Sequence, residues 1–148
     1  MTGKSDFTPE EWETIAHAPP TAALIVITAQ RGGVFRETLA LTQSYAEARK
    51  QHGQSELLDE IVASRPALDH SGYHSAEELK AAGLQHLQTA VTLLRAKATD
   101  EEAEAYRQFV IDLATRVANA HREHGQSISE SEQTALDEIG RALAAAAT

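Results

Sequence analysis

The sequence predicts an all-α protein, and three observations support this prediction. Apolar residues recur every three or four positions, as on one face of a helix, and no segment alternates convincingly with the two-residue period of a strand. The same helix-start pattern occurs four times. Alanine is abundant and aromatic residues make up only 5% of the chain, which favours closely packed helices over a β-sandwich. We expect a single domain, residues 1–148, folded as a compact bundle of about seven helices.

Four helix starts are predicted from a capping box, in which a Ser or Thr and a Glu three residues later bond to each other's backbone N–H groups. The first is Thr8 with Glu11, where Pro9 also takes the first helical position. Each Glu of such a box stands where the helix dipole favours a negative charge. The other three boxes are Ser75 with Glu78, Thr99 with Glu102, and Ser129 with Glu132.

Proline and glycine predict where the helices end. Pro19-Pro20 is expected to close the first helix and to open the second, because proline lacks the N–H that continues a helix. Gly32, Gly53 and Gly125 each follow a helical pattern and mark its end. The predicted helices lie near residues 9–18, 20–31, 35–51, 55–64, 76–98, 100–124 and 130–146.

Charge and composition exclude several classes of function. The formal net charge is −9 and neither half has a basic run, so we expect no nucleic-acid binding and no attraction to anionic membranes. The longest apolar run, residues 22–29, is too short to span a bilayer, so no membrane insertion is expected. The absence of cysteine excludes thiolate metal sites and a Cys nucleophile. Because no apolar signal region opens the sequence, we expect a cytoplasmic protein.

A helix, a glycine turn and an acidic helix start occur together twice. The segment AQRGGVFRETLAL (29–41) aligns with REHGQSISESEQTAL (122–136) when Glu37 is placed over Glu132. Self-similarity of this kind suggests two related helical hairpins around a pseudo-two-fold axis.

These two turn regions resemble the TerB-like (tellurite-resistance TerB) family of small all-helical bacterial proteins, and the opening FTPEEWETIAHAP gives weaker support. The resemblance covers half of the chain. It implies a seven-helix bundle with an internal repeat. In that family the turn reads Ala-Asp-Gly, a spacer, an apolar residue and a Glu, and its acidic residues are a candidate metal site.

Glu37 and Glu132 match the Glu of the family pattern residue for residue, but both Asp-Gly pairs are missing. The first turn has Gln30-Arg31 in that place, and the second has no Asp. Without these Asp residues the turns lack hard oxygen ligands for a metal ion. The positive charge of Arg31 beside a bound cation would also be electrostatically unfavourable. The fold therefore carries over from the family better than a metal site does.

The candidate metal ligands are Glu37, Glu132, His121 and His124. The two histidines stand three apart on one helix and can share a face. Each of these residues also has a structural explanation. Glu132 completes a capping box. The helix dipole favours the negative charge of Glu37 at a helix N-terminus and protonated histidines at a helix C-terminus. The cofactor is unknown, and a divalent metal is the candidate.

A weaker candidate is a small-molecule pocket under the segment 65–74, with His70, Tyr73 or His74 at its rim. Known catalytic motifs are absent: the sequence contains no HExxH, P-loop, GxGxxG or GxSxG pattern, and no Glu-x-x-His.

We therefore expect a non-enzymatic helical binding or scaffolding domain of TerB-like type, connected with a stress response. Its partner would be another protein or a second copy of the chain. The alternative is a protein that depends on a divalent metal or a small ligand bound at the interface between the two repeats.

Overall fold

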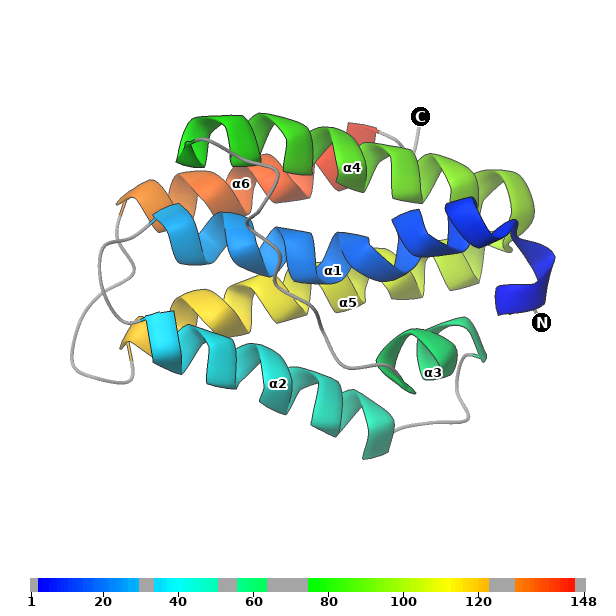
Figure 1. The fold of residues 1–148 in the computed structure, drawn as a ribbon, viewed down its shortest axis with the longest axis horizontal. Coiled ribbons are helices and arrows are strands. Elements are labelled where there is room, and N and C mark those ends of the chain that lie inside the picture. The colour runs from blue at the N-terminus through cyan, green and yellow to red at the C-terminus, as the bar shows by residue number, and fades with distance from the viewer. Residues whose placement is uncertain (1–2, 30–33, 51–55, 64–74, 123–129, 146–148) are drawn as a thin grey trace.

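The computed structural model describes residues 3–29, 34–50, 56–63, 75–122 and 130–145, and every regular element in these ranges is a helix (Figure 1). The all-α prediction is confirmed. A short 3-10 helix, η1 (Lys4–Asp6), precedes six α-helices. These are α1 (Pro9–Ala29), α2 (Val34–Lys50), α3 (Glu56–Ala63), α4 (Ala76–Lys97), α5 (Asp100–Arg122) and α6 (Glu130–Ala145).

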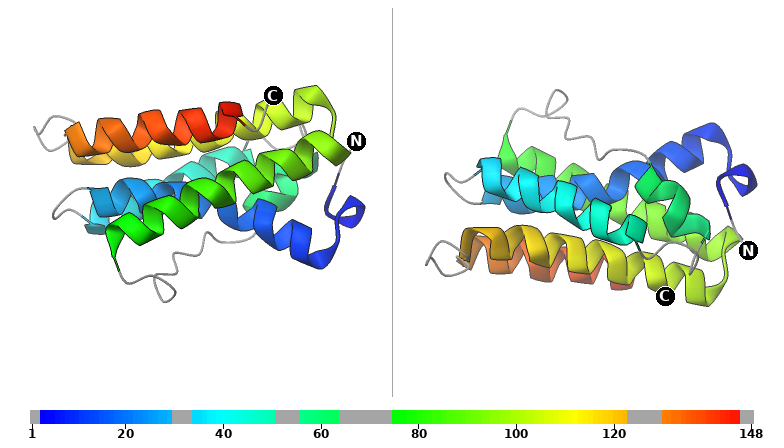
Figure 2. Two further views of the ribbon diagram at one scale, coloured as in Figure 1. Left: turned by 90° about the horizontal axis from the view of Figure 1, so that it is seen from above. Right: turned by 90° about the horizontal axis from the view of Figure 1, so that it is seen from below.

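Helix α1 is central to the bundle. It packs against α2, α4, α5 and α6, while α2 packs against α5 and the short α3 (Figure 1). The ends of α1 and α5 and the starts of α2, α4 and α6 lie at the same end of the bundle, which we call the turn end (Figure 2). Helices α2 and α6, to which the second parts of the two repeat segments belong, thus start at the same end of the bundle, and the common origin of the segments stays a prediction.

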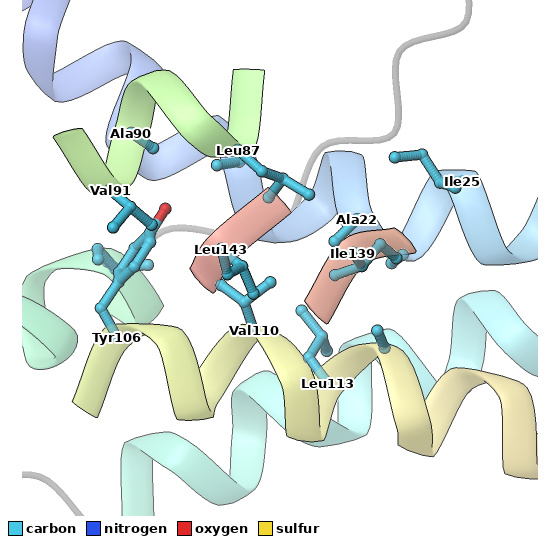
Figure 3. Close-up of a cluster of buried hydrophobic side chains, with 14 of the residues drawn as sticks. Ala22, Ile25, Leu87, Ala90, Val91, Tyr106, Val110, Leu113, Ile139 and Leu143 are labelled. Atoms are coloured by element: carbon cyan, nitrogen blue, oxygen red, sulfur yellow. The ribbon is translucent and has the colours of Figure 1, made fainter. Parts of the chain in front are cut away.

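Side chains from four helices meet in one core (Figure 3). None of those labelled in the figure exposes more than 2% of its surface, and full burial of a Leu, Ile or Val contributes about 1.5–3 kcal/mol. The labelled residues are Ala22 and Ile25 of α1, Leu87, Ala90 and Val91 of α4, Tyr106, Val110 and Leu113 of α5, and Ile139 and Leu143 of α6.

Capping boxes begin α1 and α5 as predicted. The Thr8 N–H donates to Glu11 Oε1 at 2.9 Å, and the Glu11 N–H donates to Thr8 Oγ1 at 3.1 Å. Thr99 and Glu102 exchange the same two bonds, each 3.1 Å long. At α4, Ser75 Oγ accepts the backbone N–H three residues later at 3.0 Å. Each bond satisfies a donor that has no partner within its helix.

The prolines do not end α1. The helix runs through Pro19-Pro20, so the first two predicted helices form one element. Pro19 has no N–H to donate to the Ile15 carbonyl, four residues earlier. The Tyr106 hydroxyl of α5 donates to that carbonyl instead, at 2.7 Å, inside the core.

A second side chain, that of His86 in α4, contacts the carbonyl of Thr14, the residue before Ile15. His86 Nε2 lies 2.8 Å from the Thr14 oxygen, and since a carbonyl only accepts, Nε2 carries the proton. Helix α1 bends along its length, as helices that contain proline do (Figure 2). Of these two contacts, only the bond from Tyr106 of α5 replaces a donor that a proline lacks, while His86 ties α4 to the carbonyl of Thr14, one residue earlier.

Gly83 of α4 lies directly against α1. A Cβ at this position would stand 2.7 Å from Ile25 Cδ1 and 3.0 Å from Thr21 Cγ2, so only glycine allows this approach without a shift. At Gly140 of α6 an added Cβ would meet nothing within 4 Å. An alanine side chain would therefore be crowded by α1 at Gly83, whereas it would have free space at Gly140.

Replacing Tyr106 by Phe should lower the free energy of unfolding by about 1–3 kcal/mol, because the buried Ile15 carbonyl loses its donor. In a Pro19→Ala background residue 19 regains an N–H, which can bond to the same carbonyl. The loss caused by Tyr106→Phe should then shrink. Urea unfolding of the parent, the two single variants and the double variant measures this coupling.

Tyr45→Phe is the matched control for this experiment. Tyr45 is only 1% exposed, but its hydroxyl has no hydrogen-bond partner in the described part of the chain. Its removal should not lower stability. Equal losses for the two tyrosine variants, or a Tyr106→Phe loss that Pro19→Ala leaves unchanged, would contradict the assigned role of the hydroxyl.

Gly140→Ala should raise the free energy of unfolding by about 0.5–1 kcal/mol, because alanine loses less backbone entropy in a helix and meets no obstacle here. Gly83→Ala gains the same helix propensity but pushes against Ile25, so its net gain should be smaller or negative. Thermal unfolding compares the two variants. Equal stabilisation would show that α1 and α4 are not in close contact at Gly83.

Candidate functional site

Three of the four predicted metal ligands belong to helices that start or end at the turn end of the bundle. Glu37 lies in the first turn of α2, Glu132 in the first turn of α6, and His121 in the last turn of α5 (Figure 1). The side chains of Glu37 and His121, and all of His124 and Ser129, are outside the described part of the chain. The convergence of these groups on a metal therefore stays a prediction.

Glu132 is the one predicted ligand whose side chain is described. It is completely buried, on the same face of α6 as the core residues Ala135 and Ile139. Among the described residues, no group of three or more His, Cys, Asp or Glu side chains is arranged to hold a metal ion. The segment 65–74, predicted to cover a pocket, lies outside those residues.

A cleft of about 440 Å³ opens at the turn end, between the C-terminal part of α1 and the N-terminal parts of α4 and α6. Its apolar floor consists of Ile25 and Ala29 of α1 and Ala135 of α6. Ile25 and Ala135 are buried and Ala29 is half-buried, so the floor is continuous with the core. A volume of this size is typical of small-molecule sites.

Polar and charged side chains surround the floor and form the rim of the cleft. Lys80 is held across the rim, since its Nζ lies 2.7 Å from the Oε1 of Glu138, an ion pair that joins α4 to α6. The Thr28 hydroxyl donates to the Ile25 carbonyl at 3.2 Å, which leaves its oxygen able to accept. The rim residues are Thr28, Glu77, Lys80, Glu130 and Thr134.

This lining can bind and orient a ligand. The floor offers apolar contact, and the rim offers carboxylates, an ammonium and hydroxyls. These residues could not be recognised as a group in the sequence, because they come from three helices far apart in the chain. The only local signal was that Glu77 and Glu130 stand close to predicted capping boxes.

A second group of interacting side chains lies where α4 ends. Lys97 Nζ is 2.6 Å from Glu11 Oε1 and 5.6 Å from the centre of the Phe7 ring, a cation–π distance. The hydrogen bond from Lys97, together with that from the Thr8 N–H, lowers the pKa of Glu11 below its usual 4.5. These contacts join the N-terminal segment to α4 and have a structural role.

No family model, curated protein or solved structure gives a significant match to this chain. The resemblance to the TerB-like family therefore stays a prediction from the two turn regions. None of the described helices combines the length and the apolar character that crossing a bilayer requires.

Replacing Lys97 by Met should raise the pKa of Glu11 toward 4.5, because the largest cause of its lowering is removed. Because the pKa of Glu11 is lower in the folded than in the unfolded state, its carboxylate stabilises the fold at pH values above the pKa of the unfolded state. This contribution is lost as pH falls through the folded pKa. The variant should therefore lose less stability than the parent between neutral and acidic pH.

An NMR titration of the Glu11 side-chain carboxyl carbon measures this shift directly. Lys80→Met removes a lysine that is paired with Glu138 instead, and it should leave the Glu11 titration unchanged. A Glu11 pKa that does not move in Lys97→Met would show that this ion pair does not form in solution.

Proposed function

We propose that this protein is a non-enzymatic helical binding domain that holds a small molecule in the cleft between α1, α4 and α6. The observation that carries the proposal is the cleft itself. Its volume of about 440 Å³ and its buried apolar floor with a polar rim are the features that small-molecule sites share.

The chemistry of the lining supports binding as the activity. The described lining residues present carboxylates and hydroxyls around Ile25, Ala29 and Ala135, which suits recognition of a ligand with an apolar part and a polar part. The sequence contains no motif that pairs a nucleophile with a base.

The location agrees with the alternative drawn from the sequence, a small-ligand site where the two hairpins meet. The cleft uses Glu130 and Thr134 of α6, which flank the predicted ligand Glu132. A divalent-metal site at Glu37 and Glu132, a protein partner, a dimer, and a role in a stress response all stay predictions from the sequence.

The test is an NMR screen of the isotope-labelled chain against a library of neutral, anionic and cationic small molecules. Compounds that bind should shift amide resonances of the cleft residues in a saturable way. The variant Thr134→Trp places a large side chain on the rim and should weaken binding about tenfold or more, equal to about 1.4 kcal/mol.

Thr89→Trp is the control, because Thr89 is an exposed threonine of α4, nine residues beyond Lys80 and outside the cleft lining. It should bind as the parent does. If no compound gives saturable shifts at the cleft, or if Thr134→Trp binds as well as Thr89→Trp, the proposal is wrong.

A further inference from the structure

We infer that the cleft selects an amphipathic organic cation, namely an ammonium group attached to a small apolar body. This inference rests on the proposed function and specifies its ligand class. It is carried by the arrangement of the charges on the rim around an apolar floor.

Two exposed acidic residues from different helices line the same cleft. Glu77 comes from α4 and Glu130 from α6, and within the described part of the chain neither forms an ion pair or a hydrogen bond. The ammonium of the lining, that of Lys80, is already paired with Glu138, which is not part of the lining. The described lining residues therefore carry an excess of negative charge that a bound cation would balance.

Helix capping does not account for this pair of carboxylates. At the start of α4 the hydroxyl of Ser75 caps the N–H of Glu78, the next residue after Glu77. At the start of α6 the predicted capping box pairs Ser129 with Glu132, whose buried side chain is not part of the cleft. The helix dipole favours acidic residues in any first turn, but it does not require two of them to share one cleft.

The rest of the lining matches the other parts of such a ligand. An alkylammonium has three N–H donors, and the rim offers two carboxylates and the hydroxyl oxygen of Thr28 or Thr134 as acceptors. The apolar body would cover Ile25, Ala29 and Ala135, and burial of apolar surface adds to affinity. An anion would meet the two carboxylates and be repelled.

A metal ion fits this lining less well than an organic cation does. Calcium takes six to eight oxygen ligands and magnesium six, some of them from water, and an apolar floor adds none. In the described part of the chain, no three acidic or histidine side chains come together as a metal site. The floor, in contrast, gives the apolar body of an amphipathic cation a surface to contact.

The experiment compares two probes of nearly equal shape, 2-phenylethylammonium and the neutral 2-phenylethanol, by NMR titration of the full chain at low salt. The ammonium should bind about tenfold more tightly, as expected for charge-assisted hydrogen bonds on a partly exposed rim. The double variant Glu77→Gln, Glu130→Gln should remove this preference and keep the binding of the neutral probe.

Glu101→Gln is the matched control, because Glu101 is the second residue of α5 as Glu77 is of α4, and it is exposed and outside the cleft. It should keep the full preference for the ammonium. Raising the salt concentration should reduce that preference in the parent and have little effect in the double variant.

The outcomes separate this inference from the proposed function. If both probes bind the cleft equally, or if the double variant keeps the preference, the ligand class is wrong and the binding domain stands. If neither probe nor any library compound shifts the cleft residues, both proposals fail. Displacement of the ammonium by millimolar Ca²⁺ or Mg²⁺, with saturation at the cleft, would overturn the organic cation in favour of a metal.

Discussion

The hydrogen bond from the Tyr106 hydroxyl to the Ile15 carbonyl is the interaction on which the rest of the structure depends. Consecutive prolines normally end a helix, because the carbonyl four residues before each one loses its donor. Here the Tyr106 hydroxyl of α5 supplies a donor to the Ile15 carbonyl, which Pro19 leaves without one, and His86 of α4 contacts the carbonyl one residue earlier. Helix α1 therefore continues to the turn end, where its last residues form part of the floor of the cleft.

The cleft depends on the alignment of α1, α4 and α6. Gly83 lets α4 lie directly against α1, and the ion pair between Lys80 and Glu138 joins α4 to α6. An ion pair at a partly exposed position contributes only about 0–1 kcal/mol to stability. Its larger consequence is electrostatic: it neutralises the lysine of the lining, so that among the described lining residues Glu77 and Glu130 set the charge of the rim.

Local patterns predict the described capped helix starts well, but they place a helix end and a helix start wrongly at Pro19-Pro20. A capping box involves residues three positions apart, so Thr8 and Thr99 could be recognised in the sequence and have the predicted bonds. The prediction that the helix ends at Pro19 takes into account only the hydrogen-bond donors of the same helix. The donor that replaces the missing N–H belongs to Tyr106, which is 91 residues away from Ile15. No pattern around the prolines contains that information.

The sequence by itself determined the all-α class and the positions where several helices begin, because both follow from interactions within about four residues. Only the tertiary structure decided which acidic residues face a common space. Glu130 and Glu132 are two positions apart on α6, so they point in directions about 160° apart around its axis. One contributes to the rim of the cleft and the other is buried in the core. The reason is that neighbouring helices, distant in the chain, cover one face of α6 and leave the other open.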